Sequence, residues 1–362
     1  MYILSHLKRL DWVLIVTSIL LVGIGLLSIY SSSLGKGDFS NFNKQIIFFA
    51  IGFFVMLALS FFDWRTFKTN SYFILVLYFF CVLFLVGLFF LAPEIRGVKG
   101  WYKLGPVSFD PIELTKIVLI ILLAKYFSMK HIEMYRLRHI FLSGFYVLLP
   151  SFLIFRQPDF GSALILVALW IGVLIISGIK LRHFLILSLC GILLLTLAWS
   201  FFLKDYQRER VISFLAPETE PLGMGWSQTQ SKIAIGSGGF FGQGMGQGSQ
   251  TQYGFLSEPH TDFIFASIAE EFGLFGVSFL LFLYIILFWR IMKIAIASRT
   301  NFPRLFASGI VIVLSAQLFI NIGMNLGILP VIGISLPLLS YGGSGLIAVF
   351  ISFGILQSTK VS

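Results

Sequence analysis

Three titratable side chains, Glu258, His260 and Asp262, stand directly before a long apolar run at residues 263–289. Crossing the hydrocarbon of a bilayer takes about 20 apolar residues. Backbone polar groups inside the bilayer must be satisfied within the segment, so the run is predicted to be a helix. The sequence therefore places two carboxylates and an imidazole together at the edge of a membrane.

The start of this helix bears on the role of Asp262. Pro259 biases Glu258 away from helical backbone and toward an extended conformation, so we expect the helix to begin at Thr261 or Asp262. An aspartate at such a position is often only an N-cap, worth about 1 kcal/mol. Alternatively, because a helix N-terminus favours an ionised carboxylate, Asp262 could act as a base that accepts a proton.

Two further carboxylates, Glu270 and Glu271, lie well inside the same run. Ionisable residues at membrane depth are costly and are candidates for function. At 100° per residue, Glu270 is about 80° from Asp262 around the helix, and Glu271 is about 180° away. Glu270 is therefore expected to face the same cavity as Asp262.

Three other polar positions each have a structural and a functional interpretation. Glu113 and Lys116 are three residues apart and share a helix face, so they form either an ion pair that locks the helix or a cation at the outer mouth of a cavity. Asp159 is expected to be the N-cap of the sixth apolar helix, and a contact with substrate is its alternative role.

Near the end of the chain, polar residues recur in a helical pattern and then in a glycine-rich stretch. Gln317, Asn321 and Asn325 are spaced four residues apart, which is typical of hydrogen bonding between helices, although a lining for a polar ligand is also possible. Residues 340–345, which begin with Ser340, could present backbone amides as an anion-binding nest. Their glycines could instead serve only close packing.

The composition indicates that these side chains are positioned by the helices of an integral membrane protein. Of the 362 residues, 57% are hydrophobic and only 12% are charged, against about 25% charged in an ordinary soluble domain. Cys81 and Cys190 both fall in apolar runs and give no disulfide or metal framework. We predict a single all-α polytopic membrane domain over residues 1–362 with ten spans: 11–31, 45–62, 71–92, 112–127, 139–155, 161–178, 183–202, 262–289, 305–327 and 338–358.

The distribution of charge predicts the topology. Ten spans put both termini on one side, and that side carries 15 cations against 3 acids, whereas the rest of the chain carries 11 cations against 13 acids. The positive-inside rule makes the terminal side cytoplasmic. The formal charge of +10 is thus explained by topology, and a nucleic-acid partner is not needed.

One outer loop, residues 203–261 between the seventh and eighth spans, is far longer than a connection requires. It contains a short amphipathic piece at 227–235 and the cations Arg208, Arg210 and Lys232. Its glycines fit no nucleotide-binding motif, and the chain shows neither zinc-protease spacing nor a nucleophile elbow. A carboxylate that accepts a proton from a hydroxyl, beside cations that stabilise a departing pyrophosphate, is the chemistry that these residues favour.

Four strings in this order resemble the SEDS (shape, elongation, division and sporulation) family, and the resemblance covers essentially the whole chain: 157–161 (QPDFG), 230–239 (QSKIAIGSGG), 258–266 (EPHTDFIFA) with the glutamates 270 and 271, and 337–344 (PLLSYGGS). Residues 248–252, 321–324 and 329–333 are more similar to the elongation members than to the division members.

The resemblance implies a ten-helix glycosyltransferase of the bacterial plasma membrane that polymerises lipid II outside the cell together with a class B penicillin-binding transpeptidase. The essential aspartate of the family falls on Asp262, and its paired acid and lysine fall on Glu113 and Lys116. The tryptophan-bearing outer loop falls on Trp101.

The hypothesis from the sequence is that Asp262 deprotonates a sugar hydroxyl of lipid II, which attacks an undecaprenyl-pyrophosphate-linked glycan. The candidate substrate contacts are Trp101, Glu113, Lys116, Asp159, Arg208, Arg210, Lys232, Glu258, His260 and Ser340. No cofactor is required and no protein metal site is predicted, although a divalent cation such as Mg²⁺ or Mn²⁺ could share the pyrophosphate. A flippase or transporter of lipid II, or a membrane scaffold for the transpeptidase, are the alternatives.

Overall fold

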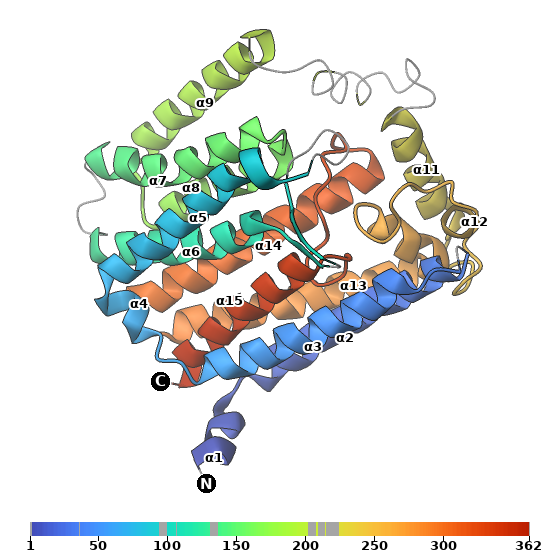
Figure 1. Cartoon of the computed structure of the whole chain (residues 1–362), viewed down its shortest axis with the longest axis horizontal. Coiled ribbons are helices and arrows are strands. Elements are labelled where there is room, and N and C mark those ends of the chain that lie inside the picture. The colour runs from blue at the N-terminus through green and yellow to red at the C-terminus, as the bar shows by residue number, and fades with distance from the viewer. Residues whose placement is uncertain are drawn as a thin grey trace.

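The chain forms a bundle of long helices in the computed structural model, which describes residues 2–35, 37–93, 100–105, 107–130, 137–201, 208, 214 and 224–361. Seven helices within these ranges are long and apolar enough to cross a membrane. The long helices run along one common direction (Figure 1). The protein is therefore an all-α multi-pass membrane protein, as the composition predicts.

Each of the ten predicted spans coincides with a helix, and the ends agree to within five residues, except that α13 runs eight residues beyond the predicted end at 289. The helices are α2 (Trp12–Leu34), α3 (Ser40–Ser60), α5 (Ser71–Leu91), α6 (Pro111–Lys130), α7 (Leu137–Arg156), α8 (Phe160–Ile176), α9 (Leu181–Phe201), α13 (Ile264–Ala297), α14 (Asn301–Leu326) and α15 (Gly343–Val361).

Short elements connect the long helices. They are α1 (Tyr2–Arg9), α4 (Arg65–Thr69), an antiparallel hairpin of β1 (Tyr102–Leu104) and β2 (Val107–Phe109), and the loop helices α11 (Met224–Ser237) and α12 (Ser249–Gln252). The amphipathic piece predicted at 227–235 lies within α11. Both ends of the chain lie at the end of the bundle opposite α11 and α12 (Figure 1).

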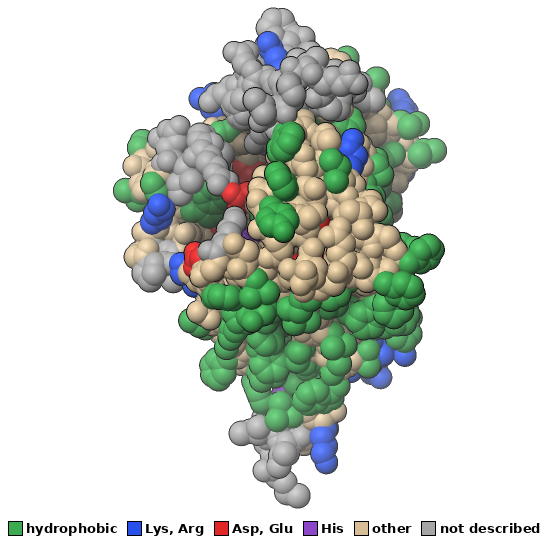
Figure 2. Space-filling model, turned by 90° about the vertical axis from the view of Figure 1, so that its right-hand side faces the viewer, with side chains coloured by type: hydrophobic (Ala, Val, Ile, Leu, Met, Phe, Trp, Pro, Cys, Tyr) green, Lys and Arg blue, Asp and Glu red, His purple; other side chains and the backbone are tan. Residues whose placement is uncertain are grey.

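Two helices at the C-terminal end of the chain hold the core together. α15 packs most extensively on α3, while α14 contacts α6, α8 and α13, and α13 also packs along α2. Apolar side chains that point away from these contacts, such as Phe54, Phe90 and Phe319, stay more than two-thirds exposed. Figure 2 shows such side chains as an apolar band below a more polar end of the molecule. Contact with lipid tails accounts for this band, because these side chains would be buried in a water-soluble protein.

The longest helix, α13, is interrupted at Gly273, whose backbone has φ 63° and ψ −163°. A left-handed φ of this kind favours glycine, which has no Cβ to clash. A nine-residue helical piece therefore precedes the break, and Glu270 and Glu271 lie on it. The long stretch of α13 with exposed apolar side chains begins only after the break, at Leu274.

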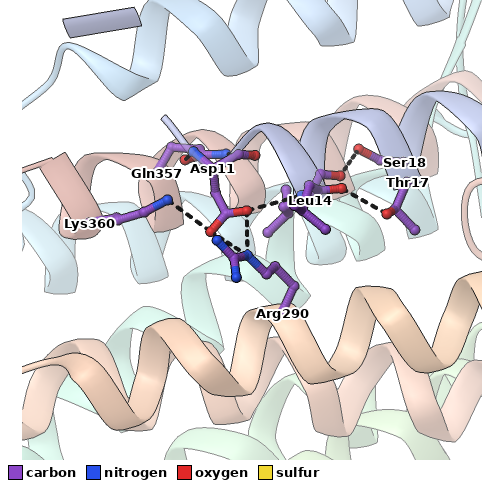
Figure 3. A network of polar contacts seen from close by, with 8 residues as sticks. Asp11, Leu14, Thr17, Ser18, Arg290, Gln357 and Lys360 are labelled. Carbon is purple, nitrogen blue, oxygen red and sulfur yellow. Dashed lines mark hydrogen bonds and ion pairs between the residues drawn. The ribbon is translucent and has the colours of Figure 1, made fainter. Parts of the chain in front are cut away.

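A buried ion cluster joins three helices at the end of the bundle that holds the chain termini (Figure 3). Asp11 is 1% exposed and caps α2 by accepting from the amide of Leu14. Its carboxylate also accepts from Arg290 Nε of α13 at 2.7 Å and from Lys360 Nζ of α15 at 3.0 Å. Gln357 completes the cluster through both its amide atoms and the main chain of Asp11. Burial opposes ionisation of Asp11, but these hydrogen bonds outweigh it and hold the pKa of Asp11 below its usual range.

Candidate active site at the outer ends of α13, α14 and α15

The segment that carries Asp262 is a tight turn and not the first turn of a helix. Glu258 has a left-handed backbone with φ 46°, and its carbonyl accepts from the amides of Thr261 and Phe263 at 3.2 and 3.4 Å. α13 begins at Ile264, two residues after Asp262. The predictions of an extended Glu258 and of a helix starting at Thr261 or Asp262 are therefore wrong, because the main chain closes around the Glu258 carbonyl before the helix begins.

Two buried asparagines of α14 hold the main chain of Asp262. Asn321 Nδ2 and Asn325 Nδ2 each donate to the Asp262 carbonyl at 3.0 Å, and Asn325 Oδ1 accepts from the amide of Ala266 at 3.2 Å. Both asparagines are 0% exposed. The predicted hydrogen bonding between helices is thus confirmed for Asn325, which bonds to Ala266 of α13. The bonds of Asn321 instead go to main-chain carbonyls of the turn and of the segment after α14, outside the helices.

The side chain of Asp262 is half-buried and lies beside the segment between α14 and α15. A Cβ atom placed on Gly333 would lie 3.6 Å from Asp262 Oδ2. Asn321 Nδ2 also donates to the carbonyl of Ile334 at 2.7 Å, so one asparagine fixes both sides of this contact. The Asp262 carboxylate therefore lies beside a glycine whose lack of a side chain leaves room next to it.

The stretch 340–342 is used to dock the turn. Ser340 Oγ donates to the carbonyl of Thr261 at 2.6 Å, and the amide of Tyr341 donates to the carbonyl of His260 at 2.8 Å. The amide of Gly342 donates to Gln45 Oε1 at 3.2 Å. The anion-nest hypothesis is wrong for these two amides, because protein acceptors take them. Close packing is the better interpretation, and Phe48 lies where a side chain on Gly343 would stand.

The other titratable residues of the turn have different surroundings. His260 is 8% exposed, and its Nδ1 lies 2.6 Å from Ser32 Oγ of α2. Glu258 is half-buried. No sequence pattern indicates Ser32, because a serine in an apolar helix is common and its partner is 228 residues away.

The buried glutamates of α13 anchor the outer loop. Glu270 accepts from the amides of Gln250 and Thr251 at 2.7 and 3.0 Å, and Glu271 accepts from Ser31 Oγ of α2 and from the amide of Gly246. Glu270 is 0% exposed. The prediction that Glu270 faces a cavity with Asp262 is therefore wrong, because the loop folds over this glutamate.

A second polar group lies at the start of α6. Lys116 Nζ and Glu113 Oε1 form the predicted ion pair at 2.7 Å, with the lysine side chain 5% exposed. Asp110 precedes α6, and its Oδ1 accepts from the amide of Ile112 at 2.8 Å. Burial, together with the neighbouring Glu113 carboxylate, raises the pKa of Asp110 to about 8. Sequence reasoning missed Asp110, although its position three residues before Glu113 was a usable signal.

Two clefts open beside the Glu113–Lys116 pair. One, of about 540 Å³ including the solvent at its mouth, is lined by the polar side chains of Ser108, Asp110, Glu113 and Ser344 and by apolar residues that include Phe48, Leu114, Ile117, Ile347 and Ile351. The other, of about 320 Å³, is lined by Glu113, Lys116, Gln317 and Ser352 among apolar residues. The ligand-lining interpretation of Gln317 is thus compatible with its position. A cleft that offers both polar and apolar side chains suits a lipid with a polar head.

One connecting segment links the two polar groups. Residues 327–342 follow α14 and contact the Asp262 turn through Ser340, and α15 then begins and brings Ser344 Oγ to 3.0 Å from the amide of Asp110. Asp159 caps α8 by accepting from the amide of Ser162, as predicted, and its charge also reaches Asp110. Figure 2 views the end of the molecule that carries α11 and α12, and acidic side chains are visible in a recess of this face.

The predicted loop residues are less closely tied to the turn. Lys232 is exposed on α11, a helix that reaches Asn325 through Ser231 Oγ at 2.9 Å. Trp101 is 36% exposed just before β1. Arg208 is half-buried, and Arg210 lies outside the described residues. Across the ranges that the structure describes, no three His, Cys, Asp or Glu residues are arranged to hold a metal ion.

The fold and the site define a class of protein, the multi-pass membrane proteins with a RodA-like fold. The chain aligns over 97% of its length with a crystal structure of the rod shape determining protein RodA of Thermus thermophilus, at 28% identity and a TM-score of 0.70 over 96% of that chain. It also aligns over 97% of both chains, at 31% identity and a TM-score of 0.82, with a chain from a structure of a peptidoglycan synthase complex that coordinates polymerization and crosslinking.

Sequence comparison then gives the family. Residues 11–362 match the model of the cell cycle proteins FtsW, RodA and SpoVE, and the chain belongs to this family. It is 37% identical to the peptidoglycan glycosyltransferase MrdB of Escherichia coli K12, covering 97% of this chain and 93% of MrdB. It is 35% identical to the stage V sporulation protein E of Bacillus subtilis, with 97% and 96% covered.

Proposed function

We propose that this chain, a peptidoglycan glycosyltransferase of the SEDS family, polymerises lipid II during cell elongation and uses Asp262 as the general base. The observation that carries the proposal is the way Asp262 is held. Two buried asparagines fix its main chain, while its carboxylate stays half-buried beside Gly333 at the end of the bundle opposite the chain termini. The resemblance to MrdB supports the elongation role.

In the proposed reaction, Asp262 takes the proton from the sugar 4-hydroxyl of one lipid II molecule. The hydroxyl oxygen attacks the anomeric carbon of the growing glycan, the bond to undecaprenyl pyrophosphate breaks, and the configuration inverts. A positioned base contributes roughly 10²–10⁴-fold to such a step. A carboxylate suits this role because it is ionised at neutral pH in ordinary surroundings.

The pyrophosphate needs positive charge as it leaves. Lys116 is bound to Glu113 at 2.7 Å, so we expect it to orient substrate as part of that pair. Lys232, on the exposed face of α11, is the more available cation for a phosphate. Trp101, Asp159, Arg208, Arg210, Glu258, His260 and Ser340 stay predictions as substrate contacts. A divalent cation, if used, would be shared between a carboxylate and the phosphates.

The proposed placement in the membrane has ten crossings, with both chain ends in the cytoplasm and the 203–261 loop outside. The cleft of about 540 Å³ between α3, α6 and α15 would take part of an isoprenoid-linked substrate. A class B transpeptidase is the proposed partner, because a similar chain occurs in a peptidoglycan synthase complex. Labelling a cysteine at position 257 from outside intact cells tests this topology, and labelling only after the membrane is opened would contradict it.

Polymerisation of fluorescent lipid II by the purified chain, with and without its transpeptidase, tests the function. Asp262→Asn should reduce glycan chain formation by roughly 10²–10⁴-fold, whereas the matched change Asp38→Asn, at an exposed aspartate between α2 and α3, should not. A flippase would make no polymer with either protein but would move labelled lipid II across liposomes. If the chain were only a scaffold, its partner would polymerise lipid II equally well with the wild type and with Asp262→Asn. Full activity of the Asp262 variant would remove the base assignment while leaving the family intact.

A further inference from the structure

The break in α13 lies at the boundary of the membrane hydrocarbon, as the lengths of two helices indicate. Lys293, near the end of α13 that faces the chain termini, lies 20 residues after Gly273, and 20 helical residues span about 30 Å, the thickness of the hydrocarbon. Counting about 20 residues along α2 from Trp12 leads to Ser31. Gly273 and Ser31 are therefore at the same boundary, the one far from the termini.

The loop between α11 and α12 is bonded to both helices at this level. The amides of Leu274 and Phe275, which the break leaves without helical partners, donate to the carbonyls of Gly239 and Phe240 at 2.9 and 3.0 Å. The amide of Gly246 donates to Ser31 Oγ at 2.9 Å. The loop thus replaces the hydrogen bonds that the break removes, and its depth is fixed by two membrane helices.

Two aromatic side chains of this loop project from the protein. Phe240 is 73% exposed and Phe241 is 85% exposed. The carbonyl of Phe240 accepts from the amide of Phe275, so Phe240 and Phe241 continue the exposed apolar face of α13. On that face Phe275 is 73% exposed and Phe279 is 47% exposed. Residues 233–257 contain no charged side chain, so nothing in this stretch opposes contact with lipid.

We propose that Phe240 and Phe241 form an anchor that inserts into the outer leaflet. Aromatic side chains are favoured at the membrane interface. Amphipathic helices that lie there bury their apolar faces about 5–10 Å into the boundary between headgroups and acyl chains. Through the bonds at the α13 break, the anchor fixes the height of the piece of α13 that follows the Asp262 turn. The occupant of this surface is phospholipid, because the surface is continuous with a helix face that already meets lipid tails. The inference is independent of the reaction proposed above.

Depth-dependent quenching on the full chain in nanodiscs tests the anchor. Cys81 and Cys190 are replaced by alanine, Phe241→Cys is introduced, and an environment-sensitive fluorophore is attached. Nitroxide placed shallowly in the lipid should quench this label more strongly than nitroxide at the chain ends, and aqueous iodide should quench it several-fold less than it quenches a label at Lys8→Cys, an exposed position on α1. A label at Phe279→Cys should respond most to the deeper nitroxide.

Iodide quenching at position 241 equal to that at position 8 would overturn the proposal. Protection of the label from iodide only after a transpeptidase is added would overturn it as well, and would identify a protein as the occupant. If Phe241→Cys does not give a monodisperse protein, Phe240→Cys provides the same measurement from the neighbouring side chain.

Discussion

Two aspartates precede long helices at opposite ends of this molecule, and their surroundings differ in kind. Asp11, before α2, has its carboxylate bonded to Arg290 and Lys360 and is 1% exposed (Figure 3). At Asp262, before α13, the two asparagines hold the main-chain carbonyl, and the side chain is half-buried. The first carboxylate joins three helices, whereas the second is presented beside a glycine.

A membrane protein can thus use the same residue type for structure and for chemistry. A buried carboxylate is tolerated when cations and donors compensate it, and removal of one partner leaves an uncompensated charge. The main chain of Asp262 is instead held by the neutral side chains of Asn321 and Asn325. The asparagines achieve this because each side-chain amide can donate to a main-chain carbonyl and still satisfy a second group.

The largest effect is expected for Asp262→Asn. If the carboxylate acts as the base, polymerisation of lipid II should fall by roughly 10²–10⁴-fold, while the thermal unfolding midpoint in detergent should stay close to that of the wild type. The amide has nearly the same shape, so a structural role would be largely preserved. A variant that polymerises normally, or one that unfolds much earlier, would break the contrast with Asp11.

The opposite outcome is expected for Asp11→Ala. The unfolding free energy should fall by about 3 kcal/mol, at the lower end of the range for a broken buried ion pair, because Arg290 and Lys360 are 20% and 31% exposed and can reach water. Activity per folded molecule should change little. Asp63→Ala, at an exposed aspartate before α4, is the control and should cost much less. A fall in activity without a fall in stability would show that the cluster does more than hold helices.

An intermediate effect is expected for Asn325→Ala, which removes one of the two donors to the Asp262 carbonyl. Loss of a buried hydrogen bond costs about 1–3 kcal/mol, and 1.4 kcal/mol expressed in the barrier is a tenfold loss of rate. We therefore expect kcat to fall by roughly tenfold or more with KM nearly unchanged. Asn43→Ala, at an exposed residue of α3, should be silent. An increase in KM at constant kcat would place Asn325 in substrate binding.

The helices of this protein could be predicted from its sequence, whereas the contacts of the segments that connect them could not. Ten apolar runs identify ten helices because hydrocarbon allows so few backbone solutions. The break at Gly273 was not predicted, because its cause is the loop segment from Gly239 to Gly244, whose main chain bonds to α13. Glycines in both segments were visible in the sequence, but their mutual contact depends on residues about 30 positions apart.

The candidate site was predicted by residue type more reliably than by role. Asp159 and the Glu113–Lys116 pair have the contacts that their spacing indicated, because these contacts are local. Glu270 was wrongly assigned to a cavity, since helical angles alone do not show that a loop covers one face. The structural role of Ser340 depends on a contact with Thr261, 79 residues away, which no local pattern encodes.

The smallest expected effect concerns a third aspartate before a helix, Asp110, whose pH dependence is opposite to that of Asp11. The native pKa of Asp110 is about 8, above the ordinary value of 3.8. The native state therefore keeps a proton that the unfolded state has released, and the unfolding free energy should fall as pH rises from about 4 to about 8. Asp11, whose native pKa is lowered, contributes stability that is lost as pH falls.

Asp110→Asn should remove the alkaline loss. We expect it to unfold at a higher temperature than the wild type at pH 8, by the equivalent of about 1 kcal/mol, and at nearly the same temperature at pH 5. The full shift from 3.8 to about 8 would allow roughly 6 kcal/mol, but we expect much less because Asp110 is only half-buried and water screens the ionised carboxylate. Equal shifts at both pH values would mean that Asp110 acts through its bond to the Ile112 amide and not through its proton, which would group it with Asp159 as a simple cap.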